Sequence, residues 1–141
     1  MNDKVFLDTN ILVYLYSEDE PEKQFVAYNI FDRFQCVTST QVLNEFCSVC
    51  LRKLGIPSNE ILNSIKEILD NCELCYIDLT TIQKALSLNK KYGYTYYDCL
   101  VLASAILHNC KCLFSEDMQH QQSIEGKLTI INPFRFESND F

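Results

Sequence analysis

The sequence predicts a three-layer α/β/α domain with a central, mostly parallel sheet of about five strands. Two observations predict this class: short apolar runs alternate with helix-like segments along the 141 residues, and only 3 glycines and 3 prolines interrupt them. Sandwiches and barrels made only of strands need many more turn-forming residues. The hydrophobic content of 48% is ample for one core.

Five short apolar runs are predicted to form the strands. The first, Val-Phe-Leu, is uniformly apolar and ends at an acidic residue, as expected for a strand that is covered on both faces. The other runs are of similar length and alternate with helix-like segments. The predicted strands are residues 5–7, 36–38, 74–77, 112–114 and 128–131.

The helices between these strands are predicted from their end signals. Ser39 or Thr40 caps one helix and Thr95 caps another, because a hydroxyl can accept a hydrogen bond from a free backbone amide at a helix start. Gly55 and Gly93 each follow a helix and favour its termination. A proline opens the second helix, where its missing amide hydrogen is not needed. The predicted helices are approximately residues 11–17, 22–34, 40–54, 58–71, 79–92 and 96–109.

Residues 1–134 are predicted to form one domain, since no internal repeat and no linker rich in glycine, serine or proline divides them. Residues 135–141, with the sequence RFESNDF, are expected to be a polar C-terminal tail.

The charge balance narrows the classes of function. With 12 basic residues against 19 acidic ones, the net charge is −7, which excludes a protein that holds nucleic acid by bulk charge alone. A nuclease that meets its substrate through metal ions is not excluded. No segment resembles a signal peptide or a membrane span, so we expect a cytoplasmic protein whose 8 cysteines stay reduced.

Two acidic residues follow predicted strands. Asp8 comes directly after the first strand, and Asp117 comes shortly after the strand at residues 112–114. Ligands of parallel sheets bind beyond the carboxyl ends of the strands, so both positions suit a functional site. Each also has an ordinary explanation, because Asp8 suits a helix cap and Asp117 suits a turn.

Two further acids fall on helix faces that are predicted to be buried. Glu45 lies among apolar residues at helical spacing, and a buried carboxylate is costly unless something pairs with it. Asp98 heads the apolar stripe of the helix that Thr95 caps. A buried salt bridge at Glu45 and a favourable helix-dipole position at Asp98 remain open as alternatives. Glu45 is surrounded by Val42, Phe46 and Val49.

The four acids together predict a metal site. If they meet at one edge of the sheet, their charges repel, so either some are protonated or a cation lies among them. Oxygen ligands without histidine or cysteine suit Mg²⁺ or Mn²⁺ better than zinc. One or two such ions can activate water and stabilise charge on a phosphodiester.

The segments around these acids resemble, in order, the four acidic motifs of PIN-domain ribonucleases: LDTNILVY, STQVLNEF, YGYTYYDCLVLASA and FSEDMQH. The similarity extends over nearly the whole chain, and it points to the VapC toxins of bacterial toxin–antitoxin modules. The resemblance implies a PIN-like fold, an Mg²⁺- or Mn²⁺-dependent endoribonuclease, inhibition by a VapB-like antitoxin, and a homodimer.

The resemblance also assigns roles by position. Asn10 matches the polar residue after the first acid, and Ser115 matches the hydroxyl residue before the last one. Glu116 could share or replace the role of Asp117. Gln121 departs from the pattern, since relatives often have glycine there, which puts the local backbone in question. The residues that match the family's catalytic and metal-binding acids are Asp8, Glu45, Asp98 and Asp117.

Lys90, Lys91 and Tyr96 are candidate RNA contacts. Two lysines at a helix end can form a rim for phosphates, and a tyrosine next to Asp98 can stack on a base. A solvated helix end and core packing explain the same residues without RNA.

Three other interpretations compete with this one. Two Cys-x-x-Cys pairs have the spacing of zinc ligands, although core packing explains them better. Asp8 could be a phosphoryl acceptor, but the second acid of such phosphatases is replaced by Asn10. A catalytically silent PIN-like module that binds RNA or protein is the third interpretation.

Overall fold

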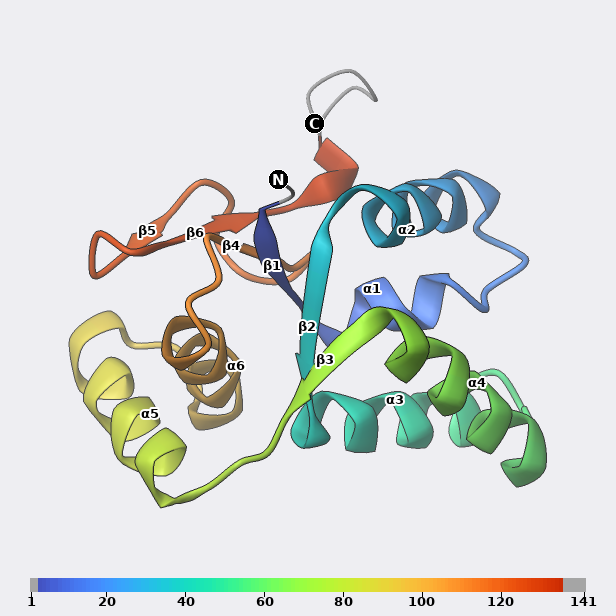
Figure 1. Cartoon of the computed structure of the whole chain (residues 1–141), viewed down its shortest axis with the longest axis horizontal. Helices are drawn as coiled ribbons and strands as arrows, with labels where there is room; N and C mark the ends of the chain where they lie inside the picture. The colour runs from blue at the N-terminus through green and yellow to red at the C-terminus, as the bar shows by residue number, and fades with distance from the viewer. Residues whose placement is uncertain (1–2, 136–141) are drawn as a thin grey trace.

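Five parallel strands form the centre of the molecule, and a short antiparallel strand extends one edge (Figure 1). The structure is a computed structural model that describes residues 3–135. The sheet has the order β3-β2-β1-β4-β6-β5. Its strands are β1 (Lys4–Leu7), β2 (Gln35–Ser39), β3 (Cys72–Cys75), β4 (Cys112–Phe114), β5 (Ser123–Ile124) and β6 (Leu128–Ile131).

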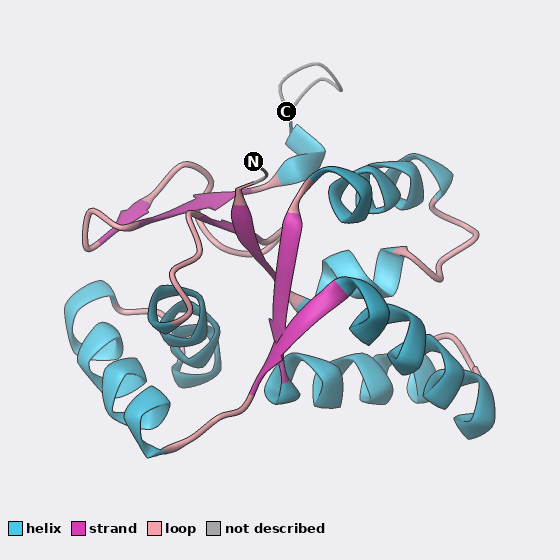
Figure 2. Ribbon diagram, viewed as in Figure 1, coloured by secondary structure: helices cyan, strands magenta, loops and turns pink. Residues whose placement is uncertain are grey.

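Helices cover both faces of this sheet, which makes three layers (Figures 1 and 2). One layer consists of α5 (Leu79–Tyr92) and α6 (Tyr96–Leu107), which pack against each other. A short 3₁₀ helix, η1 (Pro133–Arg135), follows β6 and contacts α2. The other layer consists of α1 (Thr9–Tyr14), α2 (Pro21–Arg33), α3 (Thr40–Arg52) and α4 (Ser58–Asn71).

The central strand β1 shows why the sequence forms this arrangement. Val5, Phe6 and Leu7 are all fully buried, because helices cover the sheet on both sides. On the α6 side, the apolar residues Cys99–Ile106 are all buried along with Ser104, so this helix lies in the core almost all round. The predicted α/β/α class with a mostly parallel sheet is therefore confirmed.

The structure corrects some predicted boundaries. The strand predicted at 74–77 is β3 at Cys72–Cys75, because Cys36 of β2 pairs with Cys72 and buries it, whereas Tyr76 is 70% exposed. Cysteine behaves here as a small apolar residue. The first helix is α1, which begins earlier than predicted, and β5 was not predicted. Of the predicted tail, residues 136–141 lie outside the described residues.

The helix caps predicted at Ser39 and Thr95 are present in the structure. The Ser39 hydroxyl accepts a hydrogen bond from the amide of Val42 at 3.2 Å and begins α3. The Thr95 hydroxyl accepts one from the amide of Asp98 at 3.2 Å and begins α6. Gly93 ends α5 with φ 77°, a left-handed conformation that glycine adopts easily. These caps fix where each helix meets the carboxyl edge of the sheet.

The lengths of the helices and the state of the cysteines also follow from the described residues. Every helix within residues 3–135 is too short or too polar to cross a lipid bilayer. All eight cysteines are free thiols, six of them buried.

Replacing a core leucine of α6 tests the packing of this layer. Leu102 is fully buried, so Leu102→Ala is expected to lower the free energy of unfolding by about 2–5 kcal/mol through lost contacts and a cavity. Leu107, on the same helix, is 38% exposed, and Leu107→Ala should cost about 1 kcal/mol or less. Urea denaturation measures both, and equal losses would contradict the burial pattern.

Candidate active site

The carboxyl ends of β1, β2 and β4 lie side by side, because β1 pairs with β2 on one side and with β4 on the other. From β1 the chain continues to β2, towards the β3 edge of the sheet. From β4 it continues to β5, at the opposite edge. Such a divergence is where α/β sheets bind ligands. The four acids of the sequence motifs come from this edge and from the start of α6.

Asp8 is the most constrained of these acids. One of its carboxylate oxygens accepts the amide of Thr9 at 2.8 Å and caps α1, and the other accepts the hydroxyl of Ser115 at 2.8 Å. Burial raises the pKa of Asp8 to about 6, with further contributions from the charges of Glu45 and Asp98, while the two hydrogen bonds act against the rise. The helix-cap alternative is thus correct, and it coexists with a position among other acids.

Glu45 is exposed, so the prediction that it is buried is wrong. The buried stripe of α3 is centred on Phe46 and Cys50, and Glu45 lies beside this stripe. It is nevertheless held in place at the site. One of its oxygens accepts the hydroxyl of Thr9 at 2.9 Å, and the other accepts the side-chain amide of Gln41 at 3.0 Å.

Asp98 lies partly buried in the first turn of α6. Burial raises its pKa most, the charges of Asp117 and Glu45 raise it further, and the hydrogen bond with Thr95 lowers it. Because Asp8 responds to Glu45 and Asp98, and Asp98 to Asp117, all four acids share one electrostatic environment. The four acids are therefore near enough to one another to interact electrostatically.

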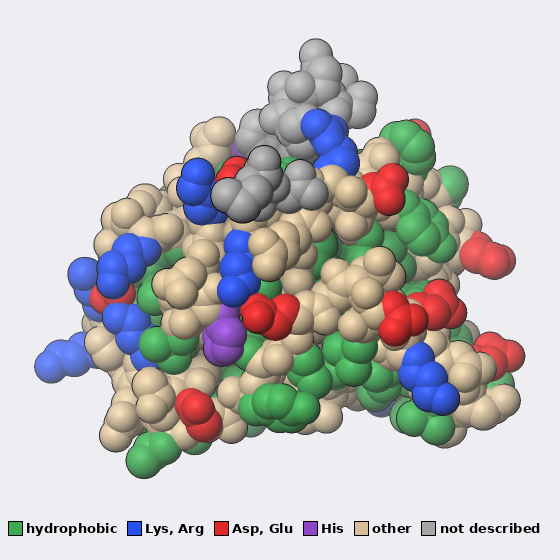
Figure 3. All heavy atoms as spheres, viewed as in Figure 1, with side chains coloured by type: hydrophobic (Ala, Val, Ile, Leu, Met, Phe, Trp, Pro, Cys, Tyr) green, Lys and Arg blue, Asp and Glu red, His purple; other side chains and the backbone are tan. Residues whose placement is uncertain are grey.

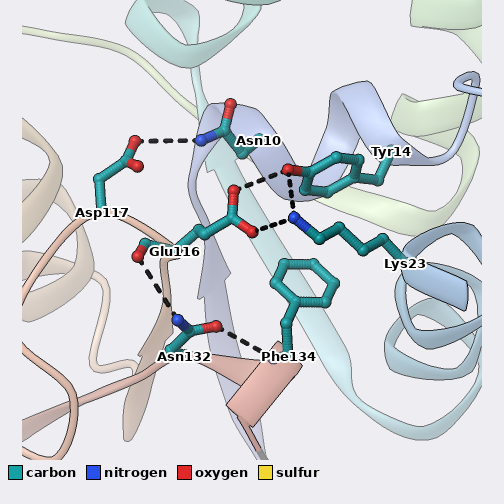
Figure 4. A network of polar contacts seen from close by, with 7 residues as sticks. All are labelled: Asn10, Tyr14, Lys23, Glu116, Asp117, Asn132 and Phe134. Carbon is teal, nitrogen blue, oxygen red and sulfur yellow. Dashed lines mark hydrogen bonds and ion pairs between the residues drawn. The ribbon is translucent and has the colours of Figure 1, made fainter. Parts of the chain in front are cut away.

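Asp117 and Glu116 point in different directions, as Figure 4 shows. Asp117 is exposed and accepts the side-chain amide of Asn10 at 3.0 Å, which is consistent with a supporting role for Asn10. The two oxygens of Glu116 instead accept hydrogen bonds from Tyr14 and Lys23, both at 2.7 Å. Glu116 is thus directed away from Asp117, and the geometry does not support a shared role for these two acids.

Two residues of the site, Thr9 and Gln41, were not predicted from the sequence. Thr9 is buried and joins Asp8 to Glu45, while the side-chain amide of Gln41 joins Glu45 to the backbone oxygen of Tyr97 at 3.3 Å. Thr9 is part of the motif LDTNILVY and Gln41 is part of STQVLNEF. Because neither side chain is charged, no pattern of charge marked them as site residues. Among the described residues, the Gln41 Oε1 atom is a buried acceptor without a hydrogen-bond partner.

The candidate RNA contacts lie on the α5–α6 side. Lys90 and Lys91 are exposed in the last turn of α5, and Lys91 lies over the ring of Tyr92 at 5.3 Å. Tyr96 makes an edge contact with Tyr97, which is 64% exposed beside Asp98. Figure 3 shows basic side chains gathered at the end of the molecule formed by α5 and the β5–β6 turn.

The carboxylate oxygens of the four acids suit a hard divalent cation, although they do not converge on one point in this structure. Within residues 3–135, no three His, Cys, Asp or Glu side chains are gathered so that they would already hold a metal ion. The carboxylates available are all oxygen donors whose charges repel. Glu45 and Asp117 are exposed, whereas Asp8 is half-buried and both of its oxygens accept hydrogen bonds.

The zinc interpretation has no support in this geometry. Cys47 and Cys50 are both in α3, and Cys72 and Cys75 are both in β3. The thiol of Cys75 donates to the backbone oxygen of Thr38 at 3.2 Å, so it belongs to the packing between strands. A hollow of about 220 Å³ is also separate from the acids, since it lies between α1, α2 and α4 and is lined by Tyr16, Phe31 and Glu67 among others.

A known domain family accounts for most of the chain. The sequence profile of the PIN domain matches residues 5–124, which include all four acids. The chain belongs to the PIN domain family. No curated protein sequence matches the chain.

Toxins and toxin–antitoxin complexes are among the solved structures that share this fold. A toxin–antitoxin complex from Klebsiella pneumoniae matches with a TM-score of 0.65 at 19% identity, over 92% of this chain and 97% of that one. The Mycobacterium tuberculosis toxin VapC20, which cleaves the sarcin–ricin loop, matches with 0.65 at 15% identity, over 80% and 91%. Rickettsia felis VapBC2, bound to promoter DNA, matches with 0.64 at 18% identity, over 90% and 96%. At these identities the similarity is one of fold.

Gln121 shows how this PIN domain departs from the family's glycine. Its φ is 68°, in the left-handed region that favours glycine, and its amide donates to the backbone oxygen of Ile130 at 2.7 Å. Gln121 therefore adopts a backbone conformation that suits glycine better, four positions after Asp117.

Neutralising Asp8 tests how far burial and the neighbouring charges destabilise its carboxylate. Because its pKa rises from an ordinary 3.8 to about 6, the folded state binds more protons than the unfolded state between these values, so stability falls as pH rises through this range. A shift of roughly 2 pKa units corresponds to about 3 kcal/mol. Asp8→Asn should therefore gain up to about 3 kcal/mol over wild type between pH 4 and pH 7.

Denaturant unfolding at a series of pH values measures this difference. Asp70→Asn, which changes an exposed carboxylate on α4, is the matched control and should follow the wild-type curve in parallel. A constant difference between Asp8→Asn and wild type across the whole range would contradict the raised pKa.

Proposed function

We propose that this PIN domain is a metal-dependent endoribonuclease that hydrolyses RNA phosphodiester bonds, and that it is the toxin of a toxin–antitoxin pair. The observation that carries the proposal is the meeting of Asp8, Glu45, Asp98 and Asp117 in one electrostatic environment, with the pKa of Asp8 raised to about 6. Holding like charges together costs stability, which is expected where a cation is to be bound.

The four acids would hold one or two Mg²⁺ or Mn²⁺ ions, since these ions prefer oxygen ligands. When bound, such an ion polarises a phosphodiester and lowers the pKa of a coordinated water. Ser115 and the amide of Thr9 orient Asp8, and their hydrogen bonds favour its deprotonated form against the rise in its pKa. Asn10 orients Asp117, and Thr9 and Gln41 orient Glu45.

The substrate in this proposal is RNA that reaches the site from the α5–α6 side. Lys90 and Lys91 would contact phosphates, and Tyr96 would contact a base beside Asp98. These contacts are local, so they are compatible with the net charge of −7. The fold is shared with VapC20, a toxin that cleaves the sarcin–ricin loop, which supports an RNA substrate for this chain as well.

The proposed partner is a VapB-like antitoxin whose basic segment enters the acidic site. Toxin–antitoxin complexes are among the structures that share the fold, and the charge of the chain complements a basic segment. We further propose a homodimer that acts in the cytoplasm.

Cleavage of RNA should depend on both the metal and the acids. Wild-type protein with Mg²⁺ or Mn²⁺ should cut total cellular RNA at defined sites, EDTA should stop it, and Asp98→Asn should reduce the rate at least about 100-fold because a ligand is lost. Gel analysis of cleavage ends measures this. Asp70→Asn serves as the control with an unaffected rate.

Activity that persists with chelator and in Asp98→Asn would contradict the catalytic proposal. Metal-independent binding of RNA without any cleavage would instead favour the catalytically silent module.

Expression with the neighbouring open reading frame tests the partner. A small protein with a basic segment should co-purify in a fixed ratio and suppress cleavage, and light scattering should give a mass containing two copies of this chain. Expression of the chain alone should inhibit growth. If no partner co-purifies and the chain alone is harmless, it is not a toxin of this kind.

A further inference from the structure

Three consecutive residues after β4 are each fastened by their side chains to the N-terminal segment of the chain. Ser115 donates to Asp8 at 2.8 Å, and Asp117 accepts from Asn10 at 3.0 Å. Between them, Glu116 points the other way and reaches α1 and α2 (Figure 4). The outer two contacts involve acids of the site, whereas the middle one touches none of the four.

The middle contact is a closed triangle of polar groups. The ammonium of Lys23 donates to Glu116 at 2.7 Å and to the hydroxyl oxygen of Tyr14 at 3.1 Å, and Tyr14 in turn donates to the second Glu116 oxygen at 2.7 Å. The side chains of Lys23 and Glu116 are only 33% and 22% exposed. Every member therefore fixes the other two.

Aromatic rings and the end of β6 support this triangle. The ring of Tyr14 meets the ring of Phe134 edge-on at 5.1 Å, and the ammonium of Lys23 lies 4.8 and 5.5 Å from the two ring centres. The side-chain amide of Asn132 donates to the backbone oxygen of Glu116 at 3.5 Å. The backbone of Glu116 is thus held from one side and its side chain from the other.

We propose that Lys23, acting with Tyr14 through Glu116, is a positioning residue that sets the location of Asp117 at the acidic site. This inference rests on the proposed metal-dependent function. Glu116 and Asp117 are adjacent and their side chains point apart, so anchoring the Glu116 side chain towards α2 constrains the backbone that directs Asp117 towards Asn10. Without the anchor, the exposed Asp117 would have only Asn10 to orient it.

A second ion pair of the same kind provides a matched control. Lys84 contacts Glu125 at 2.5 Å, with side-chain exposures of 25% and 19%, close to those of Lys23 and Glu116. It connects α5 to the β5–β6 turn and contacts none of the four acids. Because ion pairs near the surface contribute little to stability, both lysines can be replaced in a folded protein.

The experiment compares Lys23→Met, Lys23→Arg and Lys84→Met in the full chain. Calorimetric titration with Mn²⁺ measures metal affinity, and RNA cleavage measures kcat and KM. Lys23→Met should weaken Mn²⁺ binding and lower kcat, each by about 10-fold or more, because residues that orient ligands have effects of this size. In Lys23→Met the KM for RNA should stay unchanged, and Lys23→Arg should restore most of the loss. Lys84→Met should keep the wild-type Mn²⁺ affinity and kcat.

A double substitution tests the route through Glu116. If Lys23 acts only by holding Glu116, then Glu116→Gln should reproduce the loss, and Lys23→Met combined with Glu116→Gln should be no worse than Lys23→Met alone. The thermal midpoint of each variant, measured alongside, separates positioning from general loss of structure, and Lys23→Arg keeps the test valid if Lys23→Met is poorly folded.

The outcomes separate this proposal from the proposed function. Unchanged Mn²⁺ affinity and kcat in Lys23→Met, or losses equal to those of Lys84→Met, would overturn the role of Lys23 while leaving the nuclease intact. A wild-type chain that neither binds Mn²⁺ nor cleaves RNA would overturn both.

Discussion

The repulsion among carboxylates at the carboxyl edge of the sheet is the constraint on which the rest of the site depends. Asp8 is half-buried beside other acids, and burial first, then the charges of Glu45 and Asp98, raise its pKa to about 6. Two hydrogen bonds, from Ser115 and from the amide of Thr9, keep the side chain in place against this repulsion. The fold holds the acids together, which is the arrangement that a cation would stabilise.

The hydrogen bonds of the site join segments that are far apart in sequence. Thr9 links α1 to α3 through Glu45, and Gln41 links α3 to α6 through the backbone of Tyr97. The segment after β4 is tied to α1 and α2 through Asn10, Tyr14 and Lys23. Uncharged and basic side chains thus donate the hydrogen bonds that Glu45, Asp117 and Glu116 accept.

The distribution of charge fits an acidic site with a basic neighbour. The chain carries −7 overall, yet Lys84, Lys91 and Lys127 surround Glu125 and hold its pKa below the usual range. These lysines lie on α5 and the β5–β6 turn, at the end of the molecule where Figure 3 shows basic side chains gathered. An anionic polymer can approach this end although the net charge opposes it, because solution charges beyond about 10 Å are screened.

Local signals determined much of this protein from the sequence alone. The apolar run of β1, the caps at Ser39 and Thr95 and the positions of the four acids depend on nearest neighbours, so the sequence predicts them. The exposure of Glu45, the register of β3 and the contact between Lys23 and Glu116, which are 93 residues apart, were decided only by tertiary structure. The physical reason is that burial and hydrogen bonding between distant segments depend on how whole helices pack, which no local pattern contains.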